Sequence, residues 1–90
     1  MSQDDVETRI QRLLVSRLRI SAEVVATSDR RTSLLGRGVG IDSIEALALA
    51  IAIEEEFGIE VDDADMTAAL FETLGGLADY VRRRLAEGAA

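Results

Sequence analysis

Residues 38–57 read GVGIDSIEALALAIAIEEEF, and this stretch holds the strongest helix signal in the chain. Asp42 is a good N-cap, Glu45 follows three residues later as in a capping box, and Gly58 comes just after the stretch as a C-cap. These signals predict a helix over 43–57. Its middle section has no polar side chain, although an amphipathic helix normally keeps a polar face. The second apolar face therefore needs an explanation.

At 100° per residue, the apolar side chains of this helix fall on two faces. We expect one face to be buried in the core: Ala46, Leu49, Ala50, Ile53 and Phe57. The other consists of Ile44, Leu47 and Ile51, which we expect to be exposed next to Ser43. An apolar patch with a charged rim, here Glu45, Glu54, Glu55 and Glu56, is typical of a transient protein interface. The alternative is a central helix that is buried all round.

Acidic residues are concentrated in the middle of the chain, whose net charge is −7. Residues 1–40 carry seven Arg and five acids, whereas residues 41–79 carry eleven acids and no base. Such an anionic block disfavours binding to nucleic acid or an anionic membrane and favours a basic protein partner. The alternative is that these acids only keep a small domain soluble.

The composition excludes several classes of function. Ninety residues predict a single domain over 1–90. The absence of Cys and His excludes disulfides, Ser-His or Cys-His catalysis and most zinc sites, so we expect no enzyme. The segment DDADM lacks the Gly and late Glu of a calcium loop, and we predict no metal site. The charged N-terminus and the absence of a long apolar run predict a cytoplasmic protein without signal peptide or membrane span.

Helical spacing recurs elsewhere in the chain. A first helix is predicted over 4–19 from Val6, Ile10, Leu13, Leu14 and Leu18. Residues 20–41 read as a long connection anchored by Leu34 and Leu35, and residues 63–71 as a short helical piece. The last helix follows Thr73, with the stripe Leu74, Leu77, Ala78, Val81 and Leu85. With no strand signal, the sequence predicts an all-α bundle of three long helices and one short helix.

Two motifs resemble one known family. Gly40, Asp42, Ser43 and Ile44, followed by EEEFGIEV, resemble the acyl carrier proteins, whose signature is Gly-x-Asp-Ser-Leu before an acidic second helix. The later FETLGGLADYV resembles the last helix of that family, and the similarity covers essentially the whole chain.

The resemblance implies a four-helix acyl-carrier bundle in which Ser43 carries 4′-phosphopantetheine. A magnesium-dependent phosphopantetheinyl transferase would move this arm from coenzyme A, with Asp42 and Gly40 as neighbouring motif residues. The protein would be a monomer that carries acyl groups as thioesters to acyl-loading, acyl-transfer or condensing enzymes. From the residues alone, Ser43 could also be an ordinary first-turn serine, although a helix N-terminus does favour a phosphate.

The family also docks its partners through the start of the second helix. By resemblance, Ile44, Leu47 and Ile51 would supply contact area, while Glu45, Glu54 and Glu55 would attract a basic patch.

Three departures separate the chain from many fatty-acid carriers. The stretch 37–40 reads RGVG where those carriers have an acid pair and Leu-Gly, Ala48 replaces a common acid, and about three extra residues lie around 68–70. They favour a dedicated carrier in a polyketide or specialised lipid pathway. The alternatives are an aminoacyl or peptidyl carrier, and an unmodified interaction module that has kept the carrier fold.

Overall fold

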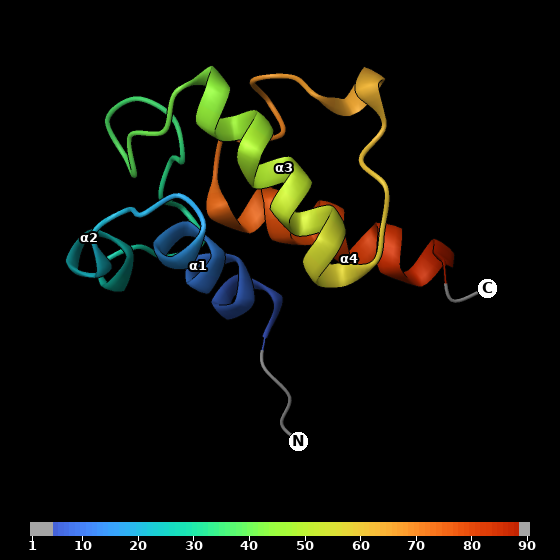
Figure 1. Ribbon diagram of the computed structural model, residues 1–90, viewed down its shortest axis with the longest axis horizontal. Helices are drawn as coiled ribbons and strands as arrows, with labels where there is room; N and C mark the ends of the chain where they lie inside the picture. The colour runs from blue at the N-terminus through green and yellow to red at the C-terminus, as the bar shows by residue number, and fades with distance from the viewer. Residues whose placement is uncertain (1–4, 89–90) are drawn as a thin grey trace.

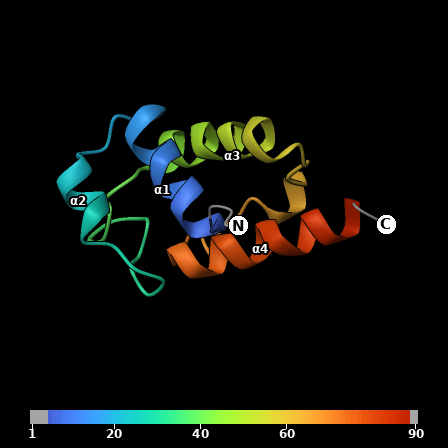
Figure 2. The same cartoon turned by 90° about the horizontal axis from the view of Figure 1, so that it is seen from below.

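The computed structural model describes residues 5–88, which form four α-helices joined by loops. The helices are α1 (Val6–Ser16), α2 (Ala22–Ala26), α3 (Ser43–Phe57) and α4 (Leu74–Gly88), with a 3₁₀ turn η1 at Asp63–Asp65. α1 contacts each of the other three α-helices, and Figures 1 and 2 show it beside both α3 and α4. No strand forms within residues 5–88, so the predicted all-α bundle is confirmed.

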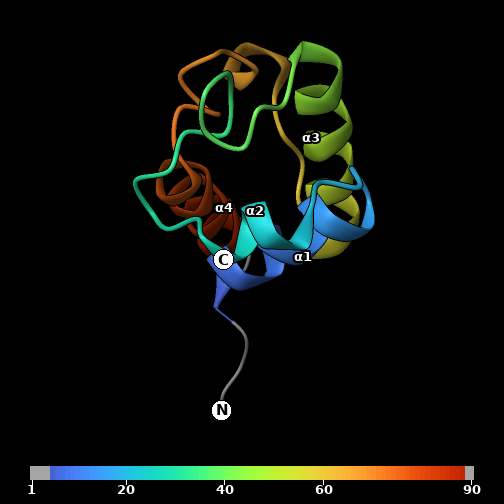
Figure 3. The same cartoon turned by 90° about the vertical axis from the view of Figure 1, so that its left-hand side faces the viewer.

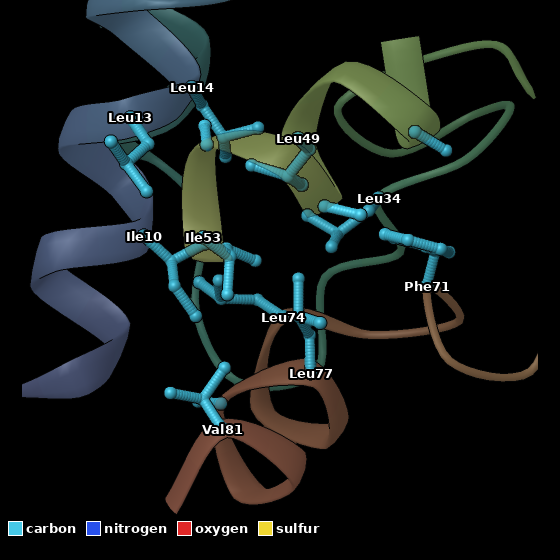
Figure 4. Packing of buried hydrophobic residues seen from close by; sticks show 14 of the residues in the cluster. Ile10, Leu13, Leu14, Leu34, Leu49, Ile53, Phe71, Leu74, Leu77 and Val81 are labelled. Carbon is cyan, nitrogen blue, oxygen red and sulfur yellow. The ribbon is translucent and has the colours of Figure 1, made fainter. Parts of the chain in front are cut away.

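The helices share one core of buried apolar side chains (Figure 4). Its most buried large members are Ile10 and Leu14 of α1, Leu34 of the α2–α3 connection, Leu49 and Ile53 of α3, and Leu74, Leu77 and Val81 of α4. Each such side chain stabilises the fold by about 1.5–3 kcal/mol relative to an exposed position. The core face predicted for residues 43–57 and the anchoring role of Leu34 are confirmed. None of the helices in the described residues is long and apolar enough to cross a membrane.

The termini of α3 are those that the sequence predicts. The Asp42 carboxylate accepts a hydrogen bond from the Glu45 N–H at 2.8 Å, and the Glu45 carboxylate accepts one from the Asp42 N–H at 3.0 Å. Gly58 ends the helix in the left-handed conformation, with φ 69°. Both ends are therefore fixed by local hydrogen bonding and backbone geometry.

The first helix ends earlier than predicted. α1 stops at Ser16 rather than at residue 19, and the predicted start at residue 4 lies outside the described residues. Arg19 adopts φ 60°, and the Ile20 N–H donates to the Leu14 carbonyl at 3.0 Å across the end of the helix. Such a left-handed residue with a long backward hydrogen bond is a common helix stop.

The short helix is also misplaced in the sequence prediction. Within the predicted connection 20–41, Ala22–Ala26 form α2, whose only buried side chain is Val25. Within the predicted helical piece 63–71, only Asp63–Asp65 are helical, and the chain then continues through turns. Phe71 is the only fully buried side chain of that piece, while Met66 and Leu70 pack against the core only partly buried, so little burial supports a longer helix.

A buried carboxylate ties α1 to α4 and to the loop before Leu34. Glu7 accepts hydrogen bonds from both Arg30 and Arg82, and Asp79 contacts the same two guanidinium groups. Burial by itself raises the pKa of Glu7, but the hydrogen bond from Arg82 and further polar contacts outweigh it and lower the pKa to about 2. Glu7 therefore remains ionised in the folded protein far into the acid range.

This network predicts acid-sensitive stability. Because the pKa of Glu7 falls from 4.5 to about 2 on folding, its contribution is complete above pH 4.5 and is lost as the pH drops towards 2. We expect Glu7→Gln to lower the free energy of unfolding by about 3 kcal/mol at pH 7, with the gap to wild type closing below pH 3. Urea unfolding across pH 2–7 measures this, with the exposed Glu72→Gln as control. A gap that is independent of pH would contradict the assignment.

Candidate functional site

Ser43 is the first residue of α3, and its side chain is exposed. The capping box immediately before and after it fixes the direction of the first helical turn. Ser43 therefore presents its Oγ from a rigid helix end rather than from a loop.

The chain reaches Ser43 through a hydrogen-bonded turn. Leu35 pairs with Ile41 in a single parallel bridge, and the Ile41 N–H donates to the Leu34 carbonyl at 2.9 Å. A Cβ on Gly38 would lie 1.7 Å from the Ser33 carbonyl oxygen, and Gly40 has φ 88°. Gly38 therefore serves close backbone packing, and Gly40 supplies a left-handed backbone conformation.

A hollow of about 290 Å³ opens beside Ser43. It is lined mainly by apolar side chains of the turn, of α3 and of the α3–α4 connection: Leu35, Ile41, Ala46, Met66, Ala68 and Phe71, with Asp42, Ser43 and Thr67 as the polar members. These three segments meet at one end of the molecule, as Figures 1 and 3 show. A group attached to the Ser43 Oγ would have an apolar surface within reach.

The electrostatics of this helix end suit a phosphate ester. The positive end of the helix dipole and free backbone N–H groups stabilise an anion there. The carboxylate of Asp42, which would otherwise repel a phosphate, accepts the hydrogen bond from the Glu45 N–H. The residues present at the site thus fit a phosphodiester on Ser43.

The outer face of α3 is exposed as predicted. The side chains of Ile44, Leu47 and Ile51 are 77%, 54% and 45% exposed. The alternative of a helix buried all round is therefore wrong. We call these three residues the outer patch.

The acids around the outer patch have intramolecular partners, and apart from the predicted capping role of Glu45, sequence reasoning missed them. Glu45 belongs to the capping box, and the Glu54 carboxylate accepts the Val61 N–H at 2.8 Å. Glu55 pairs with Arg17 at 2.8 Å, and Glu56 pairs with Arg9 at 2.9 Å. The two arginines come from α1 and its C-terminal end, so only the tertiary structure could identify these pairs. The attraction of a basic partner by Glu45, Glu54 and Glu55 stays a prediction.

The sequence of the chain is similar to those of known proteins. The family model described as "Phosphopantetheine attachment site" matches residues 8–81. "Acyl carrier protein 2" of Pseudomonas aeruginosa is 34% identical over 79 residues, which cover 87% of this chain and 91% of that protein. An "Acyl carrier protein" of Nitratidesulfovibrio vulgaris is 38% identical over 60 residues, covering 67% of this chain and 74% of that protein.

The helical bundle with an exposed serine at a capped helix start defines a carrier-type protein. The chain belongs to the acyl carrier protein family of phosphopantetheine-binding proteins. Its cofactor is covalently attached 4′-phosphopantetheine, and members of the family interact with phosphopantetheinyl transferases and acyl-handling enzymes.

Proposed function

We propose that Ser43 is the attachment residue and that the chain is a discrete carrier of acyl groups. The observation that carries this proposal is the exposed Ser43 Oγ at the capped start of α3, beside an apolar hollow. Ser43 supplies the hydroxyl, the N-terminal end of α3 stabilises the phosphodiester, and Asp42 holds the first turn in place. Gly40 supplies the backbone conformation that leads into the helix.

The attached arm supplies a thiol that holds acyl groups as thioesters, which a chain without Cys cannot provide by itself. The chain supplies the position of that arm and a surface for partner enzymes. Because the sequence has neither Cys nor His, we assign the chemical steps to those enzymes and none to the carrier.

The nature of the hollow supports an acyl cargo. Its lining is mainly apolar, and Asp42, which is engaged in capping, is its only charged member. An aliphatic chain gains from such a surface, whereas the ammonium group of an aminoacyl cargo would lose hydration there. The departures at Arg37 and Ala48 from common fatty-acid carriers favour a polyketide or specialised lipid pathway.

We also assign partner docking to the outer patch. Its three side chains form an apolar surface directly after Ser43, so an enzyme that reaches the serine would cover them. A patch of this size supports the brief, weak docking that a carrier shared between enzymes needs.

Intact-protein mass spectrometry tests the attachment residue. We expect the folded protein to gain one phosphopantetheine after incubation with coenzyme A, magnesium and a broad-specificity transferase. Ser43→Ala should lose this gain, whereas Ser21→Ala, at the exposed start of α2, should keep it. Circular dichroism of each variant confirms folding. A gain that survives in Ser43→Ala would refute the assignment. No gain from folded wild type, even with transferases of its own pathway, would indicate the unmodified interaction module.

A further inference from the structure

Among residues 5–88, an arginine without a partner lies in the turn that leads to the proposed attachment site. Arg37 is exposed and lies in the turn that joins Leu35 to Ile41. Leu35 and Ile41 both line the hollow that reaches Ser43. Within residues 5–88, the guanidinium of Arg37 has no ion-pair or hydrogen-bond partner. In the described part of the chain it is thus an unpaired positive charge, in a turn whose two ends line the hollow.

The turn holds the backbone of Arg37 in a defined place. The Gly38 N–H donates to the Leu35 carbonyl at 3.4 Å, and the Val39 N–H donates to the Ser33 carbonyl at 2.8 Å. Gly38 is so close to Ser33 that no side chain fits there. Arg37 therefore lies in a hydrogen-bonded turn that leads into α3, and Figure 1 shows this connection before α3.

None of the acids of α3 forms an ion pair with Arg37 in the described part of the chain, and Glu55 and Glu56 pair with other arginines instead. Glu45 and Glu54 accept backbone N–H groups, and Glu55 pairs with Arg17. The surface next to Ser43 thus combines the outer patch and the carboxylates of Asp42, Glu45 and Glu54, which stay charged, with one base that lacks an ion-pair partner within residues 5–88.

An enzyme that modifies Ser43 has to cover the surface around it. Covering an unpaired guanidinium is costly unless the partner supplies an anionic group, and a carboxylate pairs with it in a bidentate geometry. We propose that the phosphopantetheinyl transferase acting on Ser43 presents a carboxylate to Arg37, next to an apolar pocket that receives Ile44 and Leu47. This inference rests on the proposed function of Ser43.

Steady-state kinetics of the transferase from the same organism, with coenzyme A as second substrate, test the inference. Arg37→Glu would place two carboxylates opposite each other, so we expect the KM for the carrier to rise about tenfold. The kcat and the KM for coenzyme A should stay unchanged, and Arg37→Gln should give a smaller rise. Arg31→Glu is the matched control, because Arg31 is also exposed but lies beside the start of α4. Its neighbours Arg30 and Thr32 accept hydrogen bonds from the backbone N–H groups of Gly75 and Leu74. The KM of this control should stay within about twofold of wild type.

Each other outcome would overturn the inference. A lower KM for Arg37→Glu would indicate a basic partner surface, and an unchanged KM would place Arg37 outside the interface. A higher KM for coenzyme A would show that Arg37 binds the phosphates of that substrate instead. The mass gain at Ser43 would persist in all three cases, so the proposed function is judged separately. Failure of the wild-type protein to be modified would overturn both proposals.

Discussion

Leu49→Ala is expected to lower the free energy of unfolding by about 2–5 kcal/mol. Leu49 is fully buried on the inner face of α3, and Figure 4 shows its side chain between Leu14 and Leu34. Truncation would leave a cavity where α1, α3 and the α2–α3 connection meet. The free energy of unfolding of a small domain is about 5–15 kcal/mol, so this loss would be a large share of its stability. Urea unfolding followed by far-UV circular dichroism measures it.

Leu47→Ala is the matched control, because it removes the same atoms two residues away on the same helix. Leu47 is 54% exposed and belongs to the outer patch. We expect its stability to stay within about 0.5 kcal/mol of wild type, while its KM with the transferase rises. Equal destabilisation by the two substitutions would contradict the division of α3 into a core face and a docking face.

The local signals of α3 could be read from the sequence because they depend on neighbouring residues. The capping box of Asp42 and Glu45 and the left-handed Gly58 lie within or next to the helix that they bound. The two apolar faces follow from helical periodicity, and the structure confirms both. The motif around Ser43 likewise rests on adjacent residues, which is why it identified the family.

The features that the sequence did not predict depend on contacts across the fold or on short segments. α2 has five residues and one buried side chain, which is too little for a periodic pattern. The partners of Glu54, Glu55 and Glu56 are Val61, Arg17 and Arg9, and two of these are distant along the chain. Because Arg17 and Arg9 offset the charges of Glu55 and Glu56, the net charge around α3 is a tertiary property, and the composition of α3 overstates it.

The role of Gly38 is another such tertiary feature. In the sequence Gly38 is one of the three glycines of LLGRGVG, whereas in the structure it lies against the backbone of Ser33. A Cβ at this position would come within 1.7 Å of the Ser33 carbonyl oxygen. Because backbone atoms cannot move aside like a flexible side chain, the turn itself has to change.

Gly38→Ala is therefore expected to destabilise the protein by at least about 2 kcal/mol and to lower kcat/KM for modification of Ser43. The turn connects Leu34 of the core to Ile41, so its distortion would move the start of α3 relative to the hollow. Urea unfolding and transferase kinetics on the same samples measure the two effects.

Gly36→Asn separates this steric effect from a general need for glycine in the turn. Gly36 has φ 58° and open space where a side chain would point, and Asn tolerates that backbone conformation. We expect this variant to keep most of its stability and its rate of modification. If Gly38→Ala behaved in the same way, Ser33 would have to move freely, and the turn would not be the rigid support that positions Ser43 and Arg37. If only Gly38→Ala slowed the modification of Ser43, the close packing of Gly38 against the backbone of Ser33 would be what aligns the serine with its modifying enzyme.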